Sequence, residues 1–122
     1  MDKTFLLLGA VAAFLAVALG AFGAHGLKSR LDANHLDIYK TAVLYHFLHA
    51  LGMLIVALLP RTGTFPAESA EPVCWLLLAG ILIFSGSLYL LAVTGVTILG
   101  AITPIGGLLF LVGWACLAFA AI

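Results

Sequence analysis

Four long apolar stretches are the feature that most constrains this chain. They cover about residues 5–24, 41–59, 73–93 and 102–122, and only short connections separate them. A helix needs about 20 mostly apolar residues to cross the roughly 30 Å hydrocarbon core of a bilayer. Hydrophobic residues make up 65% of the 122 and charged residues only 8%, whereas a soluble domain has roughly 45–50% and 25%. The chain is therefore predicted to be an integral membrane protein without a soluble domain.

The stretches are predicted to be helices. Inside lipid every backbone N–H and C=O must be satisfied within the protein, so only helices or a closed barrel can span the membrane. Barrel strands alternate apolar and polar residues, and these stretches do not. We expect an all-α fold, a compact bundle of four transmembrane helices that forms one domain over residues 1–122. The expected helices cover about 5–24, 33–59, 73–93 and 103–122.

Several residues mark the expected helix ends. Asp32 is a good N-cap for the second helix, and Gly23 suits a left-handed C-cap for the first. Pro72 is expected in the first turn of the third helix, and Thr103 with Pro104 at the start of the fourth.

The first 24 residues resemble a secretory signal peptide in part, but their apolar run is as long as a full span and only Lys3, beside Asp2, charges its start. We expect this segment to remain as the first transmembrane helix. Four spans place both termini on one side. The first loop has the larger share of cations, so the positive-inside rule puts it in the cytoplasm and the termini outside. The formal charge of zero gives no reason to expect nucleic acid as a partner.

Small residues recur on one face of three helices. In a bilayer, helices associate by close packing, which small residues permit. These faces exceed what one small bundle needs, so the leading hypothesis is a non-enzymatic component that packs against copies of itself or in a larger membrane complex. The residues concerned are Gly9, Ala13, Ala16, Gly20 and Gly23, then Gly80, Ser87 and Thr94, then Gly106, Gly113 and Ala120.

The second helix has a polar stripe. Tyr39, Ala42, His46, His49 and Met53 fall within an arc of about 80° at 100° per residue. His46 and His49 would lie roughly 7 Å and 12 Å below Thr41 at 1.5 Å per residue. Ionisable groups at such depth are costly and mark candidate functional sites.

Three interpretations of the stripe stay open. Imidazoles at i and i+3 can bind a metal or a haem iron, with Met53 as a further ligand, although two histidines do not complete a ligand set and no cofactor follows from the pattern. The histidines can instead line a pocket for a quinone headgroup, a lipid or a small transported substrate. In the third interpretation His46 and His49 only bond serines, Tyr89 or carbonyls across helices. The predicted pocket consists of His25, Tyr45, His46, His49, Ser85 and Ser87.

Catalysis is not expected. The five carboxylates lie outside the apolar stretches, and no serine or cysteine has an obvious partner base. Cys74 and Cys116 fall inside spans, where a disulfide framework is not expected.

Four ordered motifs resemble a known family. They are GAFGAHGL at 20–27, TAVLYHFLHAL at 41–51, FSGSLYLL at 84–91 and ITPIGGLLFLVGW at 102–114. Together they resemble the YgdD-like small multi-pass membrane proteins, catalogued as domain of unknown function 423 and similar to transmembrane protein 256. The resemblance implies four membrane helices and, in bacteria, the inner membrane. It supplies no established activity or catalytic residue.

Overall fold

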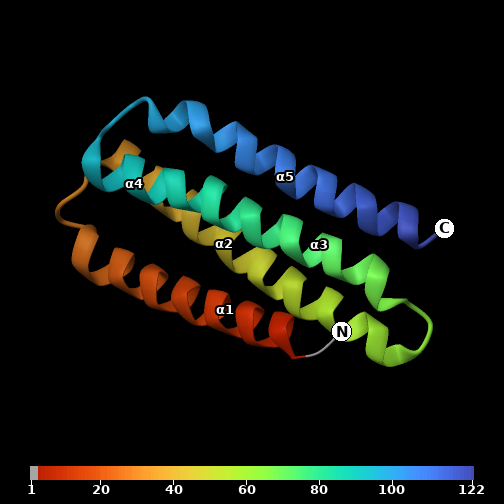
Figure 1. Cartoon of the computed structure of the whole chain (residues 1–122). Helices are drawn as coiled ribbons and strands as arrows, with labels where there is room; N and C mark the ends of the chain where they lie inside the picture. The colour runs from red at the N-terminus through yellow and green to blue at the C-terminus, as the bar shows by residue number, and fades with distance from the viewer. Residues whose placement is uncertain (1–2) are drawn as a thin grey trace.

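The computed structural model describes residues 3–122, and these residues are almost entirely helical, with no strand among them (Figure 1). Two π-helical turns, Gly23–Leu27 and Ile81–Ser85, extend α1 and join α3 to α4, so the described residues form four rods of membrane-spanning length and apolarity. The all-α prediction is confirmed. The helices are α1 (Thr4–Phe22), α2 (Ala33–Leu58), α3 (Ala67–Gly80), α4 (Gly86–Thr94) and α5 (Leu99–Ala120).

Helix α2 is the centre of the bundle. It packs against α1 on one side and against α3, the π turn Ile81–Ser85 and α4 on the other, while α5 packs on the rod formed by α3 and α4. Successive rods are antiparallel. The N-terminal end of α1, the C-terminal end of α5 and the loop between α2 and α3 therefore lie at one end of the molecule (Figure 1). Helices α1 and α5 are therefore the outer members of the bundle, and α2 can reach both of them with side chains.

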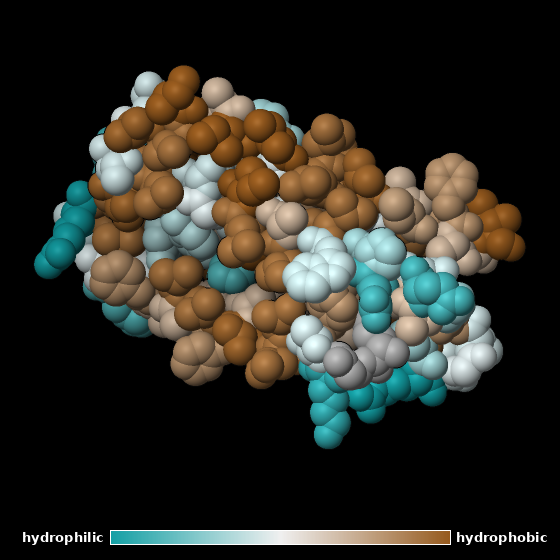
Figure 2. Space-filling model, viewed as in Figure 1, coloured by the Kyte–Doolittle hydropathy of each residue, from teal (hydrophilic) through white to brown (hydrophobic). Residues whose placement is uncertain are grey.

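The surface separates into an apolar middle and polar ends. Brown side chains cover the length of the rods in Figure 2, and teal side chains gather toward the two ends. Exposed large hydrophobic residues occur on all four rods, for example Phe14, Ile55, Leu82 and Leu111. Such a surface would aggregate in water and is stable against acyl chains.

Three helix boundaries differ from those predicted. Gly23 has φ −61° and ψ −42°, so it does not end α1, and the helix continues through the π turn. Helix α3 begins at Ala67, and α5 begins at Leu99. Pro72 and Pro104 therefore lie inside their helices and not in the first turn. Each proline only deprives the carbonyl four residues earlier of a donor, which is tolerable near a membrane surface where water can replace it.

Asp32 is the N-cap of α2, as predicted. Its backbone is extended (φ −68°, ψ 172°), and its carboxylate accepts a 2.8 Å hydrogen bond from the backbone N–H of His35. The His35 ring lies 2.8 Å from the same oxygen. The backbone N–H bond, followed by the side-chain bond, lowers the pKa of Asp32 below its ordinary value. The cap fixes where α2 begins.

The glycine faces are used inside the chain. A Cβ at Gly9 would lie 2.9 Å from Leu54 on α2, and one at Gly113 would lie 3.2 Å from Leu77 on α3. A Cβ at Gly106 would meet the backbone of Phe84. The faces of α1 and α5 are thus occupied by neighbouring helices of the same molecule. Thr94 and Ala120, at the ends of two predicted faces, are exposed.

Candidate functional site

His46 lies in the centre of the bundle and is only 5% exposed. Its Nδ1 is 2.8 Å from the hydroxyl oxygen of Tyr89 on α4. A neutral imidazole carries one ring proton, so Nδ1 either accepts the hydroxyl hydrogen of Tyr89 or donates to the hydroxyl oxygen. In both arrangements the His46–Tyr89 pair keeps one donor and acceptor capacity for a further group.

His49 lies one turn further along α2 and faces α5. Its Nδ1 donates to the carbonyl of Tyr45 at 2.8 Å, and its Nε2 accepts from the indole N–H of Trp114 at 3.1 Å. The ring stacks on Phe110 with centroids 3.6 Å apart. Both nitrogens are occupied, and the ring is the neutral Nδ1–H tautomer because a carbonyl must receive a proton. The third interpretation of the stripe, hydrogen bonding across helices, describes this histidine.

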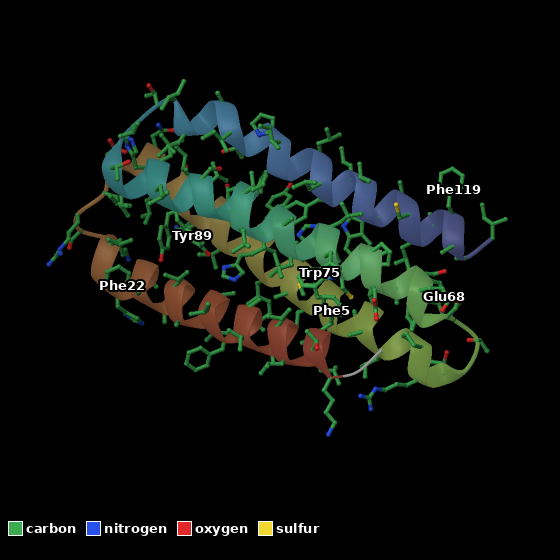
Figure 3. All side chains as sticks on the ribbon, viewed as in Figure 1. Phe5, Phe22, Glu68, Trp75, Tyr89 and Phe119 are labelled. Carbon is green, nitrogen blue, oxygen red and sulfur yellow. The ribbon has the colours of Figure 1, made fainter. Side chains whose placement is uncertain are left out.

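A cavity of about 280 Å³ lies between α1 and the rod formed by α3 and α4. His46 and Tyr89 are the polar side chains among the residues that line it, and the walls are aliphatic. Figure 2 shows a pale and teal patch recessed in the brown face, in the region where Figure 3 labels Tyr89. The cavity is open to the lipid phase through exposed Val11, Leu15 and Leu82. Its lining is Leu8, Val11, Ala12, Leu15, His46, Leu78, Ile81, Leu82, Gly86 and Tyr89.

Contacts toward both ends of α1 hold this helix against α2 and α3. Phe5 packs edge-on against Trp75 of α3, with ring centroids 4.9 Å apart, and Figure 3 shows the two labelled side chains close together. Toward the other end of α1, the hydroxyl of Tyr39 on α2 donates to the carbonyl of Leu19. Between these two contacts α1 packs on α2. The cavity lies beside α1, and His46 forms its floor.

A second hollow lies on the opposite side, between α2 and α5. Its volume is about 560 Å³, and aromatic rings dominate its walls. Gly107 has no side chain to fill the hollow at this point of α5. The nearest atoms to a Cβ there would be those of the Phe84 ring, at 3.7 and 3.8 Å. The lining residues are Tyr45, His49, Phe84, Pro104, Gly107, Leu108, Phe110, Leu111 and Trp114. We call this hollow the aromatic groove.

The predicted pocket residues do not gather at one place. His25 is exposed in the π turn after α1 and does not line the cavity at His46. Tyr45 lines the aromatic groove with His49. Ser85 donates to the carbonyl of Ala42 at 2.8 Å, and Ser87 bonds Thr103 on α5 at 2.6 Å. The two serines are thus engaged in joining helices.

The candidate metal ligands are also engaged elsewhere. Met53 is fully buried in the apolar core with Val73 and Leu77. Both nitrogens of His49 have partners, and His46 is held by Tyr89. Within residues 3–122 no group of three or more histidine, cysteine or acidic side chains is placed to hold a metal ion. A metal or haem at His46 and His49 would therefore have to displace existing hydrogen bonds.

Sequence reasoning named Tyr89 as a hydrogen-bond partner of the two histidines but left it out of the predicted pocket, and it did not name Trp114 or Gly86 as part of the site. Trp114 could have been found by asking which donors inside a span must find an acceptor, because an unpaired N–H is costly in lipid. Gly86 gives no such signal, since its role is to leave space: a Cβ there would meet nothing within 4 Å.

Comparison with known proteins identifies relatives along nearly the whole chain. A family model described as "Protein of unknown function (DUF423)" matches residues 19–107. The UPF0382 membrane protein YwdK of Bacillus subtilis is 48% identical over 122 residues, covering 98% of this chain and 97% of its own. The UPF0382 membrane protein SERP0230 of Staphylococcus epidermidis is 49% identical over 118 residues, covering 97% and 94%. No solved structure matches this chain.

Proposed function

Because the chain belongs to the DUF423 family of membrane proteins, whose function is unknown, we propose a function from the geometry of the site. We infer that this multi-pass membrane protein is not an enzyme and binds an amphiphile in the cavity between α1 and α4. The observation that carries this proposal is the position of the His46–Tyr89 pair, which forms the polar floor of a 280 Å³ apolar cavity open to lipid.

The hydrogen bonds indicate which polar group the ligand carries. In either tautomer of His46, the bond to Tyr89 leaves the pair one donor and acceptor capacity. A hydroxyl group can both accept and donate, so it suits either arrangement. The ligand class is thus an amphiphile with a hydroxyl at its polar end, such as a quinol or a lipid with a free hydroxyl. A quinone, which has acceptors only, can use the donor of the pair but not its acceptor capacity.

The proposal that the protein is not an enzyme rests on the placement of its acids. Asp32, Asp37, Glu68 and Glu71 are all exposed, and none of them lines the cavity. A general acid or base must reach the reacting group within hydrogen-bond distance. The titratable side chains that line the cavity are His46 and Tyr89, and they are bonded to each other. No carboxylate lies beside them in the lining.

A titration in nanodiscs tests the binding proposal. We expect a decyl quinol, kept anaerobic, to shift the side-chain ¹⁵N resonances of His46, and the matched decyl quinone to shift them much less. In Gly86→Leu, which fills the cavity from a position with no atom within 4 Å, the quinol shift should disappear. Gly107→Leu places the same side chain in the aromatic groove and should leave the shift intact. Equal shifts for both probes, or a shift that survives Gly86→Leu, would refute the proposal.

Assembly with a second copy or a larger complex is a second proposal. The glycine faces no longer support it, because they are occupied within the chain. The aromatic groove does, since it is open, about 560 Å³ in volume, and thinned by Gly107. We expect the Leu108→Cys variant to be captured in a crosslinked dimer or complex in native membranes. A chain that stays monomeric there would exclude this groove as the contact.

We also propose the cell (inner) membrane as the location, with both termini outside the cytoplasm. Lys28, Arg30 and Lys40 lie toward one end of the bundle, against Lys3 and Arg61 at the other, and short cytoplasmic loops carry the excess of cations. In intact cells a membrane-impermeant thiol reagent should not react with the Lys28→Cys variant.

A further inference from the structure

A third cavity lies between α1 and α2, apart from the one at His46 and from the aromatic groove. Its volume is about 350 Å³. Gly20 and Gly23 thin α1 on this side, and the α2 wall consists mainly of aliphatic and aromatic side chains. The lining residues are Gly20, Gly23, Ala24, Leu36, Tyr39, Lys40, Val43, Leu44, Phe47 and Leu48. We call this cavity the α1–α2 groove.

Lys40 gives this groove one charged end. It is the charged residue in the lining, and its side chain is exposed. Among the described residues the ion pair of the structure joins Asp32 to His35, so Lys40 is not neutralised by a carboxylate. Asp37, one turn earlier on α2, does not line the groove. The hydroxyl of Tyr39 is already donated to Leu19, which leaves the ammonium as the free polar group.

The position of Lys40 matches the membrane interface. It is the eighth residue of α2, about 10 Å along the axis from the start of the helix. A lysine at this depth extends its charge toward the headgroups while its methylenes stay among apolar atoms. Below it, Val43, Leu44, Phe47 and Leu48 continue the groove toward the bilayer centre. The groove therefore presents a cation at headgroup level and an apolar channel beneath it.

We propose that the α1–α2 groove binds an anionic phospholipid, with one acyl chain against Gly20, Gly23 and Phe47 and the phosphate beside Lys40. An anionic lipid complements the unpaired ammonium. A zwitterionic lipid carries its own cation next to the phosphate and gains less from Lys40. The site is separate from the His46 cavity and does not depend on the function proposed for it.

Native mass spectrometry of the delipidated, detergent-solubilised full chain tests this site with two lipids of identical acyl chains. We expect dioleoyl phosphatidylglycerol to bind about fivefold more tightly than dioleoyl phosphatidylcholine, which is roughly the attraction between one lysine and an anionic lipid. Lys40→Gln should remove this preference and Lys40→Arg should keep it. Ala24→Leu, which fills the groove from an exposed position, should weaken the binding of both lipids.

Matched variants separate this site from general surface charge. Lys28→Gln removes an exposed lysine of the same loop end that does not line the groove, and the preference should survive it. Gly86→Leu closes only the His46 cavity and should leave phosphatidylglycerol binding unchanged. Equal affinity for the two lipids in the unmodified chain, or an equal loss in Lys28→Gln and Lys40→Gln, would overturn the proposal.

Discussion

Gly106→Ala is expected to destabilise the bundle, although alanine is the better helix former. A Cβ at this position would lie 2.6 Å from the Cα of Phe84 and even closer to its backbone nitrogen. Backbone atoms cannot rotate away as the end of a side chain can, so α5 would have to move off the π turn Ile81–Ser85. Overpacking that forces a backbone shift costs about 1–3 kcal/mol, and sometimes more. The displacement would also lengthen the 2.6 Å bond between Ser87 and Thr103.

Gly107→Ala is the matched control in the next residue. Its Cβ would meet the Phe84 ring at 3.7 Å, which is ordinary van der Waals contact. Without a clash, the replacement of a helical glycine should stabilise α5 by roughly 0.5–1 kcal/mol. Reversible unfolding in mixed micelles of increasing SDS content measures both variants. If Gly106→Ala were as stable as Gly107→Ala, the backbone contact between α5 and the π turn would not exist as described.

The contrast between these two glycines shows what the sequence could and could not predict. The seven-residue spacing of Gly106 and Gly113 predicted a thin face on the last helix, and that face is buried. The spacing did not say whether the face meets another helix of this chain or a partner, because small residues permit close approach without specifying to what. The glycines of α1 and α5 meet helices of this chain, so they no longer support assembly with a partner, which stays a prediction. Only the positions of the neighbouring helices show what such a face meets.

The polar stripe of α2 shows the same division. Helical periodicity correctly placed Tyr39, Ala42, His46, His49 and Met53 on one buried stripe. It could not predict that the two histidines point to different helices, since the difference depends on where α4 and α5 lie around α2. Nor could it predict the cavity, because Gly86 and the aliphatic walls of α1 have no chemical signature. Cavities follow from packing, which a single sequence leaves unspecified.

His49→Ala is the second substitution with a large expected effect. It removes a ring stacked 3.6 Å from Phe110 and leaves the indole N–H of Trp114 without its partner, while the carbonyl of Tyr45 keeps its helical backbone bond. Truncation of a buried ring costs about 3–5 kcal/mol, and the freed indole N–H faces lipid and not water. We expect a loss of roughly 3 kcal/mol in the free energy of unfolding. His25→Ala makes the same chemical change at an exposed position and should cost less than about 0.5 kcal/mol.

His49→Phe divides that loss into packing and hydrogen bonding. Phenylalanine keeps a ring on Phe110 and removes only the two polar contacts, so the expected loss falls to about 1–2 kcal/mol. Adding Trp114→Phe removes the unpaired N–H as well and should recover part of that loss. If His49→Phe were instead as stable as the unmodified chain, the bonds to Trp114 and Tyr45 would contribute nothing. A free imidazole at His49 would then be available for a ligand in the aromatic groove, which the occupied nitrogens now argue against.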